Sequence, residues 1–150
     1  MRLWSTQLIE VLPKKQLVAQ WRELSSIAGS ILKYGTPNHM LVNFVMDYSY
    51  DHFISYAYYI RKEMTARGYR TMECVWNKIV SLAGGKEYTI LPLETVYNTK
   101  MDSTYFLICY HNLLEKALSG GITKEEWDKV QEKAEEIAKN FLGKDNEENI

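Results

Sequence analysis

The spacing of apolar residues between positions 17 and 31 constrains the fold of this chain more than any other feature. Apolar side chains recur there at steps of four, three, four and three residues, which is the period of one face of an α-helix. These residues are Leu17, Trp21, Leu24, Ala28 and Ile31. At about 100° per residue, Glu23 falls at the edge of this apolar face and Arg22 on the opposite side. The segment therefore predicts an amphipathic helix with a carboxylate at the rim of its buried face.

Comparable patterns along the rest of the chain predict an all-α fold. We expect an ordered N-terminal arm over residues 1–12, packed near the first helix, and a polar tail over residues 144–150 that frays. Between them we expect five helices, at residues 13–33, 50–67, 71–83, 102–118 and 124–142. Thr123 and Glu126 form a capping box before the last helix. The sequence thus predicts one compact helical bundle, a single domain over residues 1–143.

The fourth expected helix is unusually apolar. Residues Tyr105 to Tyr110 form an uninterrupted run of apolar and aromatic side chains, and a helix of that kind is buried on most of its sides. We therefore expect helix 102–118 to lie at the centre of the core. The last expected helix differs, because its large apolar residues form a single stripe: Trp127, Val130, Ala134, Ile137 and Phe141.

Length and composition fit one globular domain. At 150 residues, 46% of them hydrophobic and 25% charged, the chain can bury a core of its own. No apolar run approaches the roughly 20 residues of a membrane span, and the N-terminus lacks the layout of a signal peptide, so we expect a cytoplasmic protein. Cys74 and Cys109 lack a C-x-x-C spacing, which favours reduced thiols over a zinc site. We expect a monomer that uses no metal and no cofactor.

The net charge of −1 conceals an uneven distribution. Residues 1–122 hold 13 Lys and Arg against 10 Asp and Glu, a net charge of +3. Residues 123–150 hold 5 against 9, a net charge of −4. The body is mildly basic and the last helix is acidic, so any binding to DNA would depend on local basic patches and would weaken as salt is added.

Three segments resemble one protein family. The octapeptide Leu17–Leu24, with sequence LVAQWREL, is similar to the Leu-x-Ala-(Glu/Gln)-aromatic-Arg-Glu-Leu segment in the first helix of the T-even phage endonuclease V family, the pyrimidine-dimer DNA glycosylase/abasic-site lyases. Glu63–Tyr69 resembles the end of that family's second helix, and Asn112–Lys116 resembles its later Arg-Leu-Asp-Glu-Lys. The three matches come in the family's order and, with the spans between them, cover about residues 1–118.

The resemblance implies a DNA repair glycosylase with abasic-site lyase activity on pyrimidine dimers or similar lesions. Family members use the backbone amine of the mature N-terminus as nucleophile and a carboxylate on the first helix, and these roles fall on Met1 and Glu23. An α-amino group has a pKa of about 7.7–8.0, against about 10.4 for lysine, so more of it is unprotonated at neutral pH. We expect contacts with damaged double-stranded DNA from six polar residues: Arg2, Gln16, Arg22, His39, Asn112 and Lys116.

Departures from the family pattern leave other functions open. Arg2 is too large for removal of the initiator methionine, so we expect Met1 to remain, and Ser26 and Asn112 stand where the family has Arg. Apart from the resemblance, Glu23 fits a solvated helical acid that pairs with a neighbouring base. The alternatives are a non-catalytic helical module that binds nucleic acid or protein, and an amine-dependent enzyme that acts on a free nucleoside or sugar.

Overall fold

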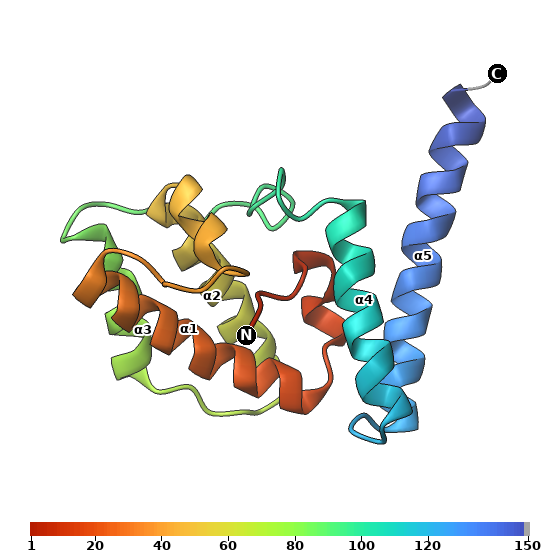
Figure 1. Ribbon diagram of the computed structural model, residues 1–150, viewed down its shortest axis with the longest axis horizontal. Helices are drawn as coiled ribbons and strands as arrows, with labels where there is room; N and C mark the ends of the chain where they lie inside the picture. Colours follow the sequence, from red (N-terminus) through yellow and green to blue (C-terminus); the bar gives the residue numbers. More distant parts are fainter. Residues whose placement is uncertain (149–150) are drawn as a thin grey trace.

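The chain is built from helices throughout its described residues. The computed structural model describes residues 1–148 (Figure 1). Its α-helices are α1 (Lys14–Tyr34), α2 (Tyr50–Ala66), α3 (Glu73–Val80), α4 (Ser103–Leu118) and α5 (Lys124–Glu148). Three short 3₁₀ helices accompany them, namely η1 (Thr6–Val11), η2 (Asn43–Asp47) and η3 (Ser81–Ala83). The all-α prediction is confirmed.

Two helices differ from their expected bounds. The third is shorter, because α3 ends at Val80 and the chain tightens into η3, after which Gly84 adopts a left-handed φ of 62°. The last is longer, because α5 continues to Glu148 instead of ending near residue 142. The helix passes through Gly143, a residue that commonly ends a helix, and no proline lies in that stretch. The tail expected to fray, residues 144–150, is therefore helical as far as Glu148, and residues 149–150 lie outside the described part.

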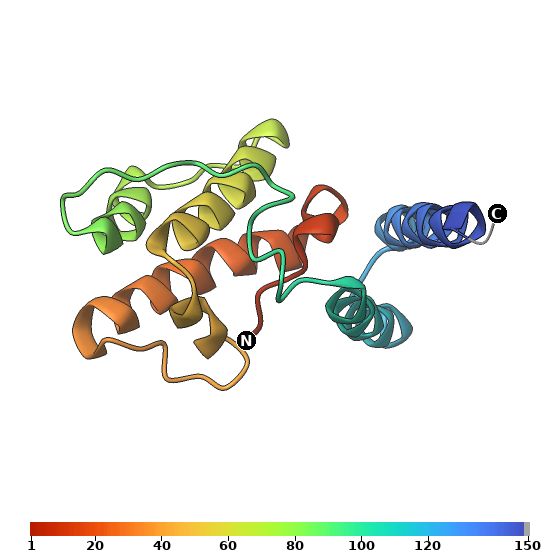
Figure 2. The same ribbon diagram turned by 90° about the horizontal axis from the view of Figure 1, so that it is seen from above.

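The helices form two unequal parts that meet at the N-terminal arm. α1, α2 and α3 pack against one another as the larger part. α4 and α5 run side by side along one edge of it, and α5 extends past the end of α4 (Figures 1 and 2). η1 contacts α2 on one side and α5 on the other, so the arm lies between the two parts.

The N-terminal arm belongs to the hydrophobic core. Leu3 and Leu8 are fully buried, Leu12 is 1% exposed and Trp4 is 8% exposed. Burial of each leucine side chain stabilises the fold by about 2 kcal/mol. These contacts fix the path of the backbone from Leu3 onward. The arm packs against α1 as the sequence predicts.

The prediction that helix 102–118 lies at the centre of the core is wrong. One face of α4 is buried, with Tyr105, Phe106, Cys109 and Leu113, but Leu107 and Ile108 on the other face are 53% and 42% exposed. An uninterrupted apolar run has no period that distinguishes a buried face from an exposed one, so the sequence cannot reveal such an edge position. Apolar as α4 is, none of the helices described here has the length and hydropathy needed to cross a membrane.

Glu126 caps two helices at once and makes their stability depend on pH. Its carboxylate accepts hydrogen bonds from the Thr123 backbone N–H at 3.1 Å and from the Lys14 backbone N–H at the start of α1 at 2.7 Å. The Glu126 N–H in turn donates to the Thr123 hydroxyl at 3.2 Å, which completes the capping box. Partial burial acts to raise the pKa of Glu126, but these hydrogen bonds outweigh it and hold the pKa below its ordinary value of 4.5.

Replacement of Glu126 by Ala should therefore lower the free energy of unfolding by about 1.5 kcal/mol at pH 7, as loss of a helix cap does. Because the folded-state pKa is depressed, the contribution of Glu126 is present above pH 4.5 and is lost as the pH falls through the folded-state pKa. Urea denaturation of both proteins at pH 7 and near pH 3 measures the difference, which should shrink at the lower pH. Glu125→Ala is the matched control, since Glu125 lies in the same first turn. An equal loss in both variants would contradict the capping role.

Candidate active site

A pocket of about 610 Å³ opens on the N-terminal half of α1, where the arm crosses the helix. The arm contributes Trp4 to its lining and α4 contributes Lys116. The other lining residues all lie on α1, namely Lys14, Lys15, Gln16, Val18, Ala19, Arg22 and Glu23. Across the whole lining, four side chains are cationic, three on α1 and Lys116 on α4, and one, Glu23, is a carboxylate. The pocket, which we call the α1 pocket, is therefore a basic hollow that contains a single acid.

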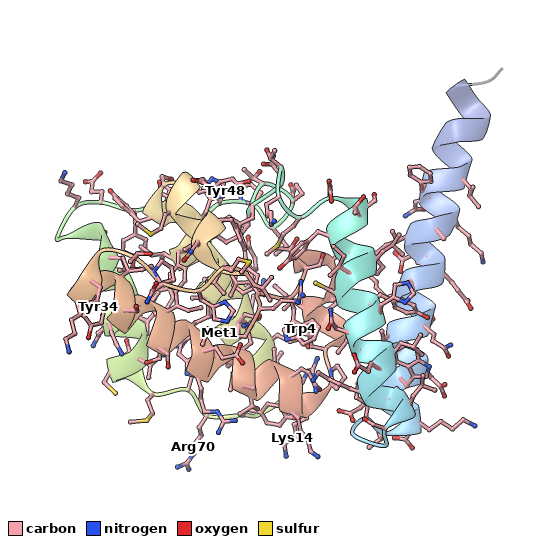
Figure 3. The ribbon with its side chains drawn as sticks, in the orientation of Figure 1. Met1, Trp4, Lys14, Tyr34, Tyr48 and Arg70 are labelled. Carbon is pink, nitrogen blue, oxygen red and sulfur yellow. The ribbon has the colours of Figure 1, made fainter. Side chains whose placement is uncertain are left out.

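Glu23 is half-buried in this pocket and is surrounded by positive charge. Burial raises the pKa of its carboxyl group above the ordinary value of 4.5. The charges of the N-terminal amine, Arg22, His39 and Lys116 act in the opposite direction, because they favour the carboxylate. The N-terminal amine exerts the largest of these four effects. The α-amino group of Met1 and the Glu23 carboxylate therefore share one electrostatic environment, and Figure 3 shows Met1 lying alongside α1.

Gln20 joins the arm to Glu23. It is a fully buried polar residue. Its Oε1 accepts a hydrogen bond from the Trp4 backbone N–H at 2.8 Å. Its Nε2 donates to the Arg2 carbonyl oxygen and to Glu23 Oε2, each at 3.1 Å. A single amide side chain thus holds both the backbone next to Met1 and the carboxylate of the pocket.

Two tyrosines hold the arm from the neighbouring helices. The hydroxyl of Tyr56 on α2 lies 2.6 Å from the Trp4 carbonyl oxygen and 2.9 Å from Gln20 Oε1, and its single proton is shared between them. The hydroxyl of Tyr105 on α4 donates to the Leu3 carbonyl oxygen. Burial raises the pKa of both tyrosines above the ordinary value of 10, so both stay protonated and able to donate.

The structure gathers most of the predicted site residues around this pocket. Gln16, Arg22, Glu23 and Lys116 line it directly. The Oε1 atom of Gln16 is buried and has no hydrogen-bond partner among the described residues. His39 lies on the loop that follows α1, and its charge, like that of the N-terminal amine, acts to lower the pKa of Glu23.

Two predicted DNA contacts lie elsewhere. The charge of Arg2 acts on Tyr105 and Cys109, so the guanidinium lies toward α4 and does not line the pocket. The Asn112 side chain donates to the Ile108 carbonyl oxygen of its own helix at 2.8 Å. The two side chains are thus engaged away from the pocket that Lys116, one turn beyond Asn112, does line.

Sequence reasoning missed three residues of this site. Gln20 falls at about 300° on the helical wheel when Leu17 is set to 0°, which places a polar amide inside the apolar face. That mismatch is a signal that could have identified it. Lys14 and Lys15 occupy the first turn of α1, which holds no acidic residue. Cations at a helix N-terminus oppose the helix dipole, so their placement indicates a use other than stability of the helix.

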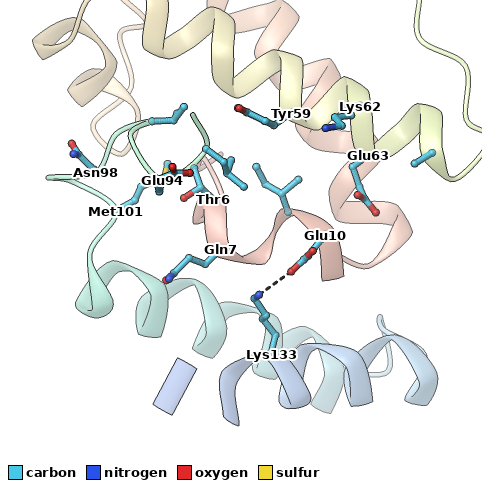
Figure 4. A pocket seen from close by; sticks show the side chains of 14 residues that line it. Thr6, Gln7, Glu10, Tyr59, Lys62, Glu63, Glu94, Asn98, Met101 and Lys133 are labelled. Atoms are coloured by element: carbon cyan, nitrogen blue, oxygen red, sulfur yellow. Dashed lines mark hydrogen bonds and ion pairs between the residues drawn. The ribbon is translucent and has the colours of Figure 1, made fainter. Parts of the chain in front are cut away.

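A second hollow, of about 550 Å³, lies on another side of the arm and has a different character (Figure 4). Three carboxylates line it, from Glu10, Glu63 and Glu94, against the two cations Lys62 and Lys133. Lys133 is already paired with Glu10 at 2.8 Å (Figure 4). A phosphate backbone would meet net negative charge there, so the α1 pocket is the candidate site for a nucleic acid.

No cluster of three or more potential metal ligands occurs among the residues whose side chains are described. The family model described as pyrimidine dimer DNA glycosylase matches residues 1–77, just over half of the chain. The matched part runs from the arm to α3 and includes every α1 residue of the pocket, whereas Asn112 and Lys116 lie beyond it. A search of curated proteins and a search of solved structures found no match. The basic pocket with its single carboxylate and the family match agree, and the chain belongs to the pyrimidine dimer DNA glycosylase family.

Proposed function

We propose that this protein is a DNA glycosylase with abasic-site lyase activity that acts on pyrimidine dimers through the Met1 amine and Glu23. The observation that carries the proposal is the shared environment of these two groups. The N-terminal charge is the strongest of the four positive charges that act on Glu23. Gln20 also bonds both the Glu23 carboxylate and the backbone carbonyl one residue after Met1. The proposal assigns the role of nucleophile to the Met1 amine and the role of proton-transferring group to Glu23, the pairing that covalent catalysis of this kind uses.

The reaction begins at C1′ of the damaged nucleotide. The unprotonated Met1 nitrogen attacks C1′, and the glycosidic bond breaks with its electron pair leaving on the base, which takes up a proton. The nitrogen then passes a proton to O4′ as the C1′–O4′ bond breaks, which opens the sugar ring and leaves a cationic imine between C1′ and Met1. Glu23 stabilises the positive charge that develops on the sugar and on the imine, and its partly buried position strengthens that interaction. Burial also raises the pKa of Glu23 above 4.5, which favours a group that both accepts and returns protons.

The strand is then cut by β-elimination. A proton leaves C2′ while the C3′–O bond breaks, and the 3′ phosphate departs with that electron pair. Water afterwards hydrolyses the imine and returns the free amine. In this proposal Glu23 takes the C2′ proton, directly or through a water molecule. The chemistry requires no oxidant, reductant or metal ion.

The cations around the α1 pocket would bind the phosphate backbone. Lys14, Lys15, Arg22 and Lys116 line it with exposed side chains. Each phosphate contact releases a counterion, so about four contacts would give binding that falls steeply as salt rises.

Borohydride trapping tests the proposal. The untagged protein is mixed with duplex DNA that carries an abasic site, sodium borohydride is added, and the product is mapped by mass spectrometry. We expect a reduced cross-link on the Met1 nitrogen, which borohydride forms only from an imine. Protein whose N-terminus has been acetylated serves as the matched control and should give no cross-link.

The absence of a cross-link from protein with a verified free amine would contradict the lyase proposal. The non-catalytic binding module would then be the better interpretation, since the Asn112 side chain is engaged within its own helix and residues 123–150 carry a net charge of −4. A cross-link formed equally well with free deoxyribose would favour the enzyme acting on a nucleoside or sugar.

A further inference from the structure

Three exposed cations form a row along one face of α1. They are Lys15, Arg22 and Lys33, and at about 100° per residue they fall within about 20° of one another around the helix axis. The only acidic residue of α1, Glu23, points about 100° away from Arg22. At 1.5 Å per residue the row is about 27 Å long, and its first two members line the α1 pocket. We call these three cations the α1 row.

The spacing of the α1 row leaves one gap. Lys15 and Arg22 are seven residues apart, and the next step of seven falls on Gly29. Glycine carries no charge, and the exposed residue nearest to it on this face, Ser26, is neutral. From Arg22 to Lys33 the α1 row therefore runs about 17 Å without a cation that belongs to α1.

Lys78 of α3 lies in this gap. α3 packs against α1 (Figure 1). A Cβ atom added to Gly29 would lie only 2.9 Å from Lys78 Nζ, which places the ammonium group directly over the glycine. Lys78 Nζ also donates a hydrogen bond to Ser25 Oγ at 3.4 Å. Any larger residue at position 29 would displace the ammonium, so the glycine makes room for a cation from another helix.

The charge of Lys78 is not neutralised within the part of the chain that the structure describes. No carboxylate there forms an ion pair with it, whereas Glu73 on the same helix pairs with Arg61. Lys78 is partly exposed, and Ser25 accepts one of the three hydrogen bonds that an ammonium group can donate. The remaining donors and the full positive charge are therefore available to a ligand.

A row of cations matches a ligand with regularly repeated negative charge. A DNA strand carries one phosphate for every 3.4 Å of the duplex axis, so a row about 27 Å long can contact the backbone at several points. Phosphate contacts fix the position of a duplex on a protein and carry no sequence information. A duplex that follows the α1 row has one end of its contact at the α1 pocket.

We infer that Lys78 binds a phosphate of the DNA backbone and completes the α1 row from a second helix. The inference rests on the proposed function, because it describes how the DNA substrate lies across that site. Gly29, and with it the Lys78 ammonium, lies about 10 Å beyond Arg22 along α1, so the contact continues past the pocket toward Lys33. Lys78 takes part in no chemical step.

The salt dependence of binding tests this contact without any chemistry. The probe is a duplex that carries a tetrahydrofuran abasic analogue, which cannot form an imine, and its affinity is measured by fluorescence anisotropy between 50 and 200 mM NaCl. Loss of one phosphate contact reduces the slope of log affinity against log salt by about 0.9. We expect this reduction for Lys78→Gln. Its loss of affinity relative to the wild type should therefore be about 3.5-fold smaller at 200 mM than at 50 mM. Undamaged duplex should show the same reduction, since it carries the same phosphates.

Two further variants separate a local contact from an effect of net charge. Lys62→Gln is the matched control, because Lys62 is exposed on α2 and lines the second hollow (Figure 4). It removes the same charge and should leave the slope unchanged. Ser26→Arg added to Lys78→Gln returns a cation to the α1 row, because Ser26 is exposed and lies about 40° from Arg22 around the helix axis. The double variant should regain the wild-type slope.

Each result supports or overturns the phosphate contact. A wild-type slope for Lys78→Gln overturns it, and so does an equal reduction for Lys62→Gln, which would be an effect of net charge alone. A reduction that Ser26→Arg does not restore also overturns it, because the lost interaction would not be a charge in the α1 row. A reduction that Ser26→Arg restores, together with no borohydride cross-link on Met1 of the wild type, would support the phosphate contact and refute the proposed nucleophile.

Discussion

Replacement of Glu23 by Gln should lower the rate of strand cleavage about 10³-fold while the protein stays folded. A side chain that transfers protons contributes about 10²–10⁴-fold, and a charge that stabilises a developing cation contributes a similar factor. Glutamine keeps the shape of the residue and can still accept the hydrogen bond from Gln20 Nε2. It cannot take a proton and carries no charge. Single-turnover cleavage of abasic duplex DNA measures the loss.

The same Glu23→Gln replacement, which lowers the cleavage rate, should leave the stability of the protein unchanged or raise it. Burial raises the folded-state pKa of Glu23 above 4.5, so at neutral pH the folded protein holds a carboxylate that is more stable in water. As the pH rises from 4.5 through the folded-state pKa, the wild type loses stability that the Gln variant keeps. The unfolding midpoint of the variant in urea should therefore equal or exceed that of the wild type at pH 7. A charged group that lowers the stability of the fold at neutral pH is expected where that group serves catalysis.

Glu115→Gln provides the control for Glu23. Glu115 is an exposed acid on α4, next to Lys116 in the chain, and it lines a separate hollow. Its replacement changes the net charge by the same amount and should leave the cleavage rate within about twofold, as substitutions at exposed positions away from a site do. Near-normal cleavage by Glu23→Gln, with the wild-type N-terminus, would remove Glu23 from the mechanism.

Replacement of Gln20 by Ala should lower the free energy of unfolding by about 3 kcal/mol. The Trp4 N–H and the Arg2 carbonyl oxygen, both in the arm, would lose the Gln20 side chain as their hydrogen-bond partner. Each unsatisfied buried group costs about 1–3 kcal/mol. The Tyr56 hydroxyl keeps its contact with the Trp4 carbonyl oxygen, which limits the loss. Urea denaturation at pH 7 gives the difference, with Gln131→Ala on α5 as a control because that residue is exposed.

Activity and stability should separate in a second variant, Gln20→Glu. Its carboxylate can accept from the Trp4 N–H, but it cannot donate to the Arg2 carbonyl oxygen or to Glu23. It would also place a second negative charge next to Glu23, which raises the Glu23 pKa further. The ascending limb of the pH–rate profile should therefore move to higher pH, which a purely structural role would not produce. An unchanged profile would restrict Gln20 to a structural role.

Local spacing predicted the existence of the helices and the position of Glu23 at the edge of a buried face. The apolar face that begins at Leu17 and includes Trp21 repeats with a clear period. Both helix α1 and the position of Glu23 at the rim of that face follow from a helical rotation of about 100° per residue. The capping box at Thr123 and Glu126 likewise formed where four adjacent residues predicted it. In each case, the information lies within one or two turns of helix.

Features that depend on distant partners could not be predicted in this way. The run from Tyr105 to Tyr110 shows no period, so nothing in it indicates that Leu107 faces solvent. The Glu126 carboxylate also bonds the Lys14 N–H, 112 residues away, and no local pattern encodes that contact. Lys116 lines the α1 pocket because tertiary packing places α4 beside α1, and no local pattern encodes that packing either. The resemblance to a family identified Lys116 where spacing could not.

The burial of the N-terminal arm has a consequence for how the protein is made. Three contacts tie the first 14 residues to the final third of the chain: Tyr105 to Leu3, Glu126 to Lys14, and Lys133 to Glu10, at separations of 102, 112 and 123 residues. During translation the arm emerges first and its partners emerge last. Leu3 and Leu8 therefore remain without their final neighbours until α4 and α5 have left the ribosome, and contacts of such long range form slowly. The arm, and with it the Trp4 side of the α1 pocket, therefore reaches its final packing only after α4 and α5 have been synthesised.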